Sequence, residues 1–302
     1  MDLKSKIILI YGPTASGKSE FALKIARKIN GEVVNADSMQ IYKELKILSA
    51  RPNPKDHNNI KHHLYGFVSV KKNFSTGDWL KFANKKIYEI RSKKKVPIIV
   101  GGTGLYFKAL IEGLVEIPKI PINFRSKIRF LHKKIGQKKF FLKLKKIDPT
   151  AASKINPLDS QRTIRAYEIK SYTKKSIYEW FKNTKSSYAK DEFYKIYIDF
   201  PKNDLIIRIN RRTKEMLKSG AIQEVKKFIS HKVSKNKTAN KAIGISEIRE
   251  YLVKKIKKDD VIEKISIKTR QYAKRQRTWA RGNMTNWNKI NLAGLNKLLK
   301  KI

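Results

Sequence analysis

The residues best suited to chemistry lie near the N-terminus, in the loop GPTASGKS. This loop fits the pattern G-x-x-x-x-G-K-[ST], in which glycines let backbone N–H groups approach the oxygens of a phosphate chain. In such a loop Lys18 reaches the terminal phosphates, and the Ser19 hydroxyl helps to hold a magnesium ion. A plain glycine-rich turn is the alternative. The pattern predicts a phosphate-binding loop made of Gly12, Pro13, Thr14, Ala15, Ser16, Gly17, Lys18 and Ser19.

Two aspartates follow apolar runs and could hold magnesium or act on a substrate. Asp37 comes directly after the run EVVNA, where the end of a parallel strand faces the ligand crevice of a doubly wound sheet. The alternative is that Asp37 or Ser38 caps a helix. Asp199 ends another run just before Pro201, which favours a turn. The chain has no N-K-x-D motif, so a GTPase is excluded.

Two further segments carry polar groups. The run VPIIV leads into GGTG, where glycines and Thr103 at a strand end can approach a ligand closely; a plain strand-to-helix turn is the alternative. Near the C-terminus, TRQYAKRQRTW alternates cations with aromatic residues. Helical spacing places Arg270, Lys274 and Arg277 near one face, which suits contacts to RNA phosphates. A solvated basic helix face is the alternative for this segment.

The elements that must position these residues form an α/β pattern. Three short apolar runs near residues 7, 32 and 96 are typical of buried parallel strands, and each is followed by a potential helix. A fourth run, KIYIDF, comes only at 195–200, after a long helical interval. We therefore predict a P-loop NTPase-like parallel sheet core at 1–117 and 195–302, with basic C-terminal helices and a helical insertion domain at 118–194.

Composition narrows the class of partner. The 302 residues contain 70 Lys and Arg against 25 Asp and Glu, a formal net charge of +45 that attracts polyanions such as nucleic acid. A general bias toward Lys, Ile and Asn is the alternative source of part of this excess. There is no cysteine, which excludes disulfides and thiolate metal sites. No apolar run is long enough to cross a bilayer, so we expect a cytoplasmic protein with no membrane partner.

The order of the motifs resembles the tRNA dimethylallyltransferase family, also called isopentenyl-diphosphate:tRNA isopentenyltransferases. The resemblance covers almost the whole chain and rests on GPTASGKS, DSMQIY, VGGTGLYFKAL, DSQRTIRAYE, RINRRTKEML, AIG and TRQYAKRQRTW. It implies transfer of a dimethylallyl group from dimethylallyl diphosphate to the N6 amine of the adenosine 3′ to the anticodon. This adenosine is position 37 of tRNAs that read codons beginning with U, and diphosphate is released. The phosphate loop would then hold an isoprenoid diphosphate.

The resemblance also implies roles for individual residues. Asp37 is the candidate general base for the weakly nucleophilic adenine amine, while Thr103 and Arg208 are the other catalytic candidates and Arg208 would contact the diphosphate. The expected partners are a tRNA anticodon stem-loop and dimethylallyl diphosphate, for a monomeric enzyme that uses Mg²⁺. The tRNA path would be lined by Asp37, Ser38, Met39, Gln40, Thr103, Arg125, Gln161, Arg162, Thr163, Ile164, Arg165, Lys241, Ala242, Ile243, Gly244, Ile245 and Ser246.

Two segments depart from the family pattern, and two other functions stay open. Relatives commonly have G-T-A-K-P where this chain has LSARP, and G-Y-R where it has GIS at 244–246. The second departure removes an aromatic residue and a cation from contacts expected at Ile245 and Ser246. A small-molecule or nucleotide kinase could use the same loop and would need ATP. A basic RNA-binding protein with a vestigial phosphate loop would bind tRNA and form no product.

Overall fold

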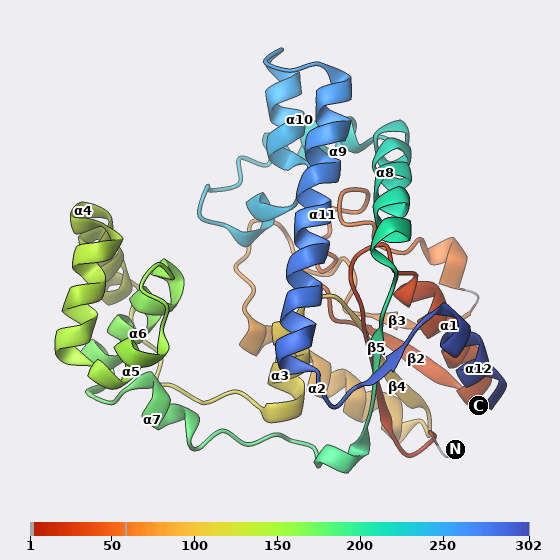
Figure 1. The fold of residues 1–302 in the computed structure, drawn as a ribbon, viewed down its shortest axis with the longest axis horizontal. Coiled ribbons are helices and arrows are strands. Elements are labelled where there is room, and N and C mark those ends of the chain that lie inside the picture. Colours follow the sequence, from red (N-terminus) through yellow and green to blue (C-terminus); the bar gives the residue numbers. More distant parts are fainter. Residues whose placement is uncertain (1–2, 58, 302) are drawn as a thin grey trace. The chain divides into compact units, whose positions relative to one another are not determined.

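The computed structural model describes residues 3–57 and 59–301, in two compact units. One unit comprises the stretches Met1–Ile111 and Tyr188–Ile302, and we call it the core unit. The other, which we call the insert, comprises Glu112–Ser187. Each unit is described by itself, with the elements labelled in Figure 1.

The core unit is built on a parallel sheet. Within the described residues the strand order is β3-β2-β4-β1-β5-β6, and every pairing is parallel. The strands are β1 (Ile7–Tyr11), β2 (Gly31–Asn35), β3 (His62–His63), β4 (Val96–Gly101), β5 (Phe193–Ile198) and β6 (Asn288–Ile290). The four strands and the α/β class predicted from sequence are confirmed.

The register brings the candidate loops together. Tyr11, the last residue of β1, is paired with Gly101 at the end of β4, and Asn35 at the end of β2 is paired with Val100. Because these strands are parallel, their carboxyl ends lie at one edge of the sheet. The phosphate loop and the segments that carry Asp37 and Thr103 therefore start from neighbouring points.

Helices cover both faces of the sheet. Alternate residues such as Ile8 and Ile10 pack against α1 and α12, whereas Leu9 and Tyr11 pack against α2, α3 and the end of α11. The helices of the core unit are α1 (Lys18–Ile29), α2 (Thr76–Ser92), α3 (Gly104–Glu112), α8 (Lys202–Lys218), α9 (Ala221–Ser230), α10 (Ile245–Leu252), α11 (Lys258–Asn283) and α12 (Leu292–Lys301). Short 3₁₀ helices lie at Pro54–His57, Lys190–Glu192 and Thr238–Lys241.

A second apolar cluster joins the C-terminal helices. Buried side chains of α8, α9, α10 and the first half of α11 pack with the segment around Tyr42, and Phe228 and Ile248 are wholly buried. The long helix α11 runs from this cluster to the sheet, beside α8 (Figure 1). These two helices therefore carry their basic side chains past the ends of the strands.

The insert has a small helical core. Phe140, Leu144 and Ala166 are wholly buried, and α4 bends at Gly136, whose φ of 76° and ψ of 166° interrupt the helix. The four helices among the described residues of the insert are α4 (Ile122–Ile147), α5 (Pro149–Lys154), α6 (Ser160–Thr173) and α7 (Ile177–Phe181).

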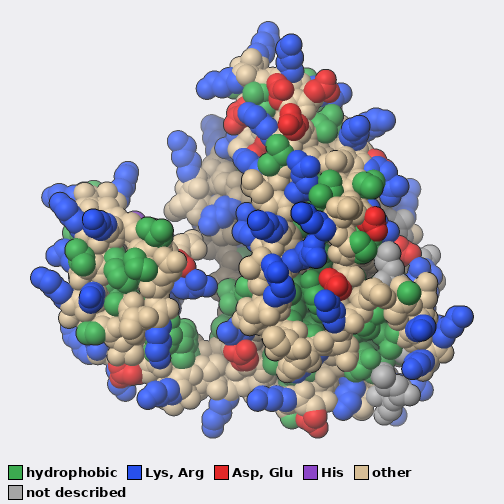
Figure 2. All heavy atoms as spheres, in the orientation of Figure 1, with side chains coloured by type: hydrophobic (Ala, Val, Ile, Leu, Met, Phe, Trp, Pro, Cys, Tyr) green, Lys and Arg blue, Asp and Glu red, His purple; other side chains and the backbone are tan. Residues whose placement is uncertain are grey.

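Cations dominate the surface. Figure 2 shows Lys and Arg side chains spread over the visible faces of both units, with few Asp or Glu side chains between them. Within residues 3–57 and 59–301, no helix combines the length and apolar character that crossing a membrane requires.

Candidate active site

The phosphate loop connects β1 to the N-terminus of α1. Gly17 precedes the helix with a φ of 80°, and Ala15 has a φ of 65°, so successive backbone N–H groups curve around one point. The Ser16 hydroxyl is buried and has no hydrogen-bond partner among the described residues. Together with the positive end of α1, this arrangement is suited to an anion.

Two cations point into the loop. Lys18 Nζ donates to the carbonyl of Pro13 at 3.2 Å, and an Arg212 terminal nitrogen donates to the Thr14 hydroxyl at 2.7 Å. Burial lowers the pKa of Lys18 to about 8; the Asp37 carboxylate opposes this shift and Arg212 adds to it. Burial also lowers the pKa of Arg212, again opposed by Asp37. These residues therefore share one electrostatic site.

Arg208, the arginine chosen from the sequence, lies one helical turn before Arg212 on α8. Its guanidinium stacks over the ring of Phe200, 4.4 Å from the centroid, beside Gly17. Both arginines thus flank the loop, but the one bonded to it is Arg212. Sequence reasoning missed Arg212, although its spacing of four residues from Arg208 puts both on one helix face.

Asp37 is held by an Asx-type turn after β2. Its N–H donates to Asn35 Oδ1 at 2.9 Å, and its Oδ1 accepts from the Met39 N–H at 2.9 Å. Its other oxygen, Oδ2, has no hydrogen-bond partner in residues 3–57 and 59–301. No helix begins at residue 38 in this part of the chain, so the helix-cap alternative does not apply. One carboxylate oxygen is therefore fixed and the other is available to a substrate.

Thr103 connects the end of β4 to the Asp37 segment. Its Oγ1 accepts from the Ser38 N–H at 2.9 Å, and its own N–H donates to the Ala36 carbonyl at 3.1 Å. A Cβ at Gly101 would lie 2.1 Å from the Ala36 carbonyl oxygen, so this approach requires glycine. The GGTG segment thus fixes the strand end that carries Asp37.

Gln276 on α11 links the phosphate loop to the segment that follows β4. Its Oε1 accepts from the Thr14 N–H at 2.8 Å, and its Nε2 donates to the Gly102 carbonyl at 2.9 Å. Tyr272, one turn earlier, lies close to Asp37; burial raises the pKa of its phenol and Asp37 raises it further, so the hydroxyl stays a donor at neutral pH. Neither residue was singled out as a site residue from sequence.

A cavity of about 290 Å³ joins the loop to Asp37. Its wall includes Thr14, Asp37 and Arg212, together with residues of the segments predicted to line the RNA path. From those segments the cavity takes Ser38, Met39, Lys241, Ala242 and Ile243. A molecule in this cavity can touch the anion site and the unpaired Asp37 oxygen at once.

The residues at 241–246 have mixed environments. Lys241 and Ser246 are exposed, whereas Ala242 and Ile245 are buried in the helical cluster. The Ser246 hydroxyl donates to Glu247 Oε1 at 2.9 Å. Gly244 is the N-cap residue of α10, with a φ of 106°. Gln40 donates to the carbonyls of Ser49 and Ala50 and so stabilises the LSARP segment.

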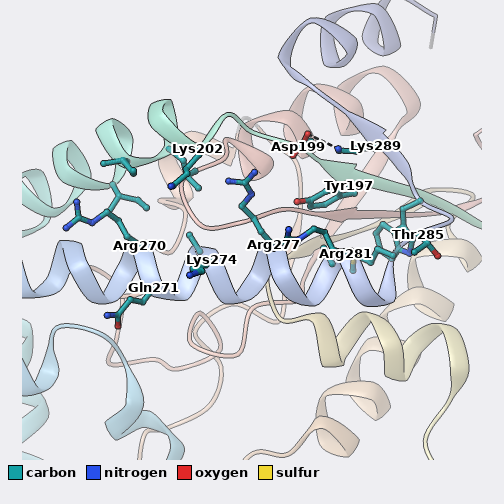
Figure 3. Close-up of a pocket in the computed structure, with 17 residues that line it drawn as sticks. Tyr197, Asp199, Lys202, Arg270, Gln271, Lys274, Arg277, Arg281, Thr285 and Lys289 are labelled. Atoms are coloured by element: carbon teal, nitrogen blue, oxygen red, sulfur yellow. Dashed lines mark ion pairs between the residues drawn. The ribbon is translucent and has the colours of Figure 1, made fainter.

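The basic face of α11 lines a second cavity, of about 770 Å³, between α8, α11, β5 and β6 (Figure 3). Arg270, Lys274 and Arg277 lie along this cavity, as their helical spacing predicts. Asp199 also lines it and pairs with Lys289 at 3.2 Å, so it stands apart from the Asp37 cavity.

The insert holds the other residues of the predicted RNA path. Arg125 pairs with the buried Glu168, and Arg162 pairs with Asp159 at 2.7 Å on an exposed face. Gln161 is exposed and Ile164 is half-buried. Thr163 is wholly buried and donates to the Asp159 carbonyl, so it packs the insert and has no surface to offer RNA.

The chain is similar in sequence to members of one enzyme family. A protein-family model described as IPP transferase matches residues 40–283. The tRNA dimethylallyltransferase of Pelagibacter ubique is 58% identical over 302 residues, which cover 100% of this chain and 96% of the relative. The tRNA dimethylallyltransferase of Allorhizobium ampelinum is 41% identical over 288 residues, 95% of each chain.

Solved structures agree with the sequence comparison. The full-length tRNA isopentenylpyrophosphate transferase of Bacillus halodurans superposes with a TM-score of 0.70 at 30% identity, over 98% of this chain and 95% of that chain. A eukaryotic dimethylallyltransferase acting on tRNA superposes with a TM-score of 0.82 at 28% identity, over 95% and 73%. The phosphate loop, the Asp37 cavity and the full-length similarity together place this chain in the tRNA dimethylallyltransferase family.

Proposed function

We propose that the chain transfers the dimethylallyl group of dimethylallyl diphosphate to N6 of the adenosine at position 37 of tRNAs reading codons that begin with U, releasing diphosphate. The observation that carries this proposal is the single cavity whose wall holds Thr14 and Arg212 of the anion site together with Asp37. A prenyl donor held at the loop would present its allylic carbon toward a base entering the same cavity. The family assignment argues against the two alternatives, a kinase and an RNA-binding protein with a vestigial phosphate loop.

Asp37 is the proposed proton acceptor. The adenine amine is a weak nucleophile because its lone pair is delocalised into the ring, so removal of its proton as the N–C bond forms lowers the barrier. Oδ2 is available for that proton, while the Met39 N–H holds Oδ1 in place. Thr103 fixes the backbone beside it through the Ser38 N–H.

The phosphate loop is the proposed site of charge stabilisation. Negative charge gathers on the leaving diphosphate as the allylic carbon becomes cation-like, so the loop N–H groups, Lys18 and Arg212 act most strongly in the transition state. Arg208 lies beside the same loop and adds a further cation.

The protein groups available as metal ligands suit a magnesium ion that arrives with the diphosphate. Among the described residues, no group of three or more His, Cys, Asp or Glu side chains is placed to hold a metal ion. Magnesium takes many of its ligands from phosphate oxygens and water, so the Ser19 hydroxyl at the start of α1 fits its binding there. Bound Mg²⁺ would neutralise charge on the diphosphate.

The target base must leave the stack of the anticodon loop to reach the cavity. We propose that the RNA is contacted along Ser38 to Gln40, Lys241, Ile243 and Ser246, and by exposed cations of the insert and of α11. Proteins usually recognise RNA loops by contacting splayed bases and by placing cationic side chains against the phosphate backbone. A monomer in the cytoplasm stays our prediction for the enzyme's state and location.

The direct test is incubation of the protein with an unmodified anticodon stem-loop, labelled dimethylallyl diphosphate and Mg²⁺. The proposal expects label on one adenosine and an equal amount of released diphosphate. Replacing the donor by ATP should give neither RNA labelling nor phosphate release. Binding of the stem-loop without label transfer would favour the RNA-binding alternative instead.

Donor use should fall at high pH because of Lys18. Its pKa of about 8 lies below the ordinary 10.5, so the ammonium is charged below about pH 8 and loses its proton above it. We therefore expect kcat/KM for dimethylallyl diphosphate to fall about tenfold per pH unit above this point. The control is Lys18→Arg, whose guanidinium stays charged and should flatten the profile. A flat wild-type profile to pH 9.5 would contradict this role.

The basic face of α11 should contribute to the salt dependence of tRNA binding. Contacts between cations and single-stranded RNA phosphates release counterions, with a log–log slope near −0.7 per contact. Neutralising Arg270, Lys274 and Arg277 together to Gln should flatten the slope by about 2. Filter binding at several salt concentrations measures it.

A matched variant tests whether position or charge alone decides this slope. Changing Lys297, Lys300 and Lys301 of α12 to Gln removes the same number of charges from another part of the core unit. We expect this variant to keep a slope close to that of the wild type. Equal flattening in both variants would assign the α11 cations to a solvated face.

A further inference from the structure

One buried carboxylate in the insert holds three arginines. Glu168 is 1% exposed, and its two oxygens accept from Arg125 Nε at 3.1 Å and from Arg129 Nε at 3.2 Å. A terminal nitrogen of Arg165 lies 3.6 Å from the same carboxylate. We call Arg125, Arg129 and Arg165 the arginine cluster.

Helix geometry explains how the arginine cluster forms. Arg125 and Arg129 are four residues apart on α4, and Arg165 lies three residues before Glu168 on α6, so each pair shares a helix face. The two helices pack against each other on both sides of the bend of α4 at Gly136: the arginines meet Glu168 before it, and Phe140 meets Tyr167 after it. A wholly buried acid between them therefore faces cations from both helices.

The cluster has more positive charge than Glu168 can balance. Three guanidinium groups surround one carboxylate, and the described residues supply no other acidic partner to any of them. Burial lowers the pKa of Arg165; Glu168 opposes this shift, and Arg125 and Arg129 add to it through like-charge repulsion. Because the three positive charges are held close together and repel one another, a second anion beside them would lower their electrostatic energy.

The free donors of the cluster are at its surface. Arg125 and Arg129 bond to Glu168 through Nε, and within residues 3–57 and 59–301 no hydrogen bond engages the terminal NH₂ groups of either guanidinium. The three arginine side chains are 39%, 58% and 42% exposed. Guanidinium groups fixed at one end and open at the other match the several oxygens of a phosphate.

We propose that Glu168 is a positioning residue, which holds Arg129 together with Arg125 and Arg165 of the expected tRNA path ready for one backbone phosphate of the tRNA substrate. The proposal rests on the tRNA-modifying function proposed above. A purely structural ion pair would need one arginine for a buried carboxylate, whereas here three are held, each partly exposed. An anchored guanidinium also loses less side-chain freedom on binding than a free one.

The sign of the effect of Glu168→Gln tests the proposal. This change keeps the side-chain size and makes the insert more positive, so charge alone predicts equal or tighter tRNA binding. Loss of the positioning carboxylate predicts instead a Kd for tRNA about tenfold weaker. The rate at saturating tRNA and the KM for dimethylallyl diphosphate should stay unchanged. Glu116→Gln, which removes an exposed acid of the insert, is the matched control and should not weaken binding.

A second pair of variants decides the matter if Glu168→Gln unfolds the insert, as judged by circular dichroism. Arg129→Gln and Lys133→Gln each remove one positive charge from α4, one helical turn apart. The proposal expects a clearly larger loss of tRNA affinity for Arg129→Gln. Equal losses, or unweakened binding by a folded Glu168→Gln variant, would overturn it.

Activity of the wild-type preparation separates the two proposals. Wild-type protein that prenylates the stem-loop while Glu168→Gln binds it normally would reject only the role of the arginine cluster. Wild-type protein that binds tRNA without prenylating it would reject the proposed reaction, and the affinity comparison would still judge the cluster.

Discussion

Asp37→Asn should lower the single-turnover rate of prenyl transfer by about two to four orders of magnitude, the usual contribution of a positioned general base. Asparagine keeps an oxygen that can accept from the Met39 N–H, so the turn after β2 should persist. The variant loses the oxygen that can take the proton. Because the change leaves intact the cations that we propose to contact RNA, we expect tRNA affinity to stay within a few-fold of the wild type.

A matched aspartate controls for the loss of charge. Asp199→Asn removes a carboxylate at the end of β5, which pairs with Lys289 and lies away from the Asp37 cavity. It should react at nearly the wild-type rate. If Asp37→Asn also keeps the wild-type rate, the role of Asp37 is limited to stabilising the turn after β2.

The sheet core could be predicted because β1, β2 and β4 are buried along their whole length and β5 along most of it. The runs that became β1, β2, β4 and β5 read as nearly continuous apolar segments, as parallel strands do. The edge strands β3 and β6 escaped prediction because they are only 2 and 3 residues long and partly exposed. The family and the class of reaction were also predicted correctly, since they depend on the order of local motifs.

Residues that act through distant partners could not be predicted in the same way. Arg212 bonds to Thr14 across 198 positions, and Gln276 bonds to Thr14 across 262. No local pattern carries such a contact, because it depends on how α8 and α11 pack beside the sheet. The GPTASGKS motif specifies the loop, but its supporting contacts come from the C-terminal helices.

Two residues that the motifs assigned to the RNA path are buried in the structure. Thr163 and Ile245 were assigned to the RNA path because they fall inside contiguous motif segments, yet both are at most 1% exposed. A helix turns about 100° per residue, so a run of neighbours cannot all face one ligand. Glu168 is the complementary case. It is an acid, so a search of the sequence for cations that contact RNA passes over it, although it pairs with three of them.

A stem-loop with guanosine at the target position should give no prenylated product. Guanine carries an oxo group where adenine carries its N6 amine, so no nucleophile reaches the donor even if the base enters the cavity. The phosphate contacts are unchanged by this substitution, and we expect binding within a few-fold of that of the adenosine stem-loop.

A third stem-loop, with two base pairs exchanged in the distant stem, separates recognition from chemistry. Its backbone phosphates are the same, so its single-turnover rate at saturation should match that of the parent, with any change confined to affinity. Single-turnover rates and Kd values on the three stem-loops therefore report different steps. Prenylation of the guanosine stem-loop at a rate comparable to the parent would mean that another amine is the acceptor, and it would reject both the target atom and the placement of Asp37 beside it.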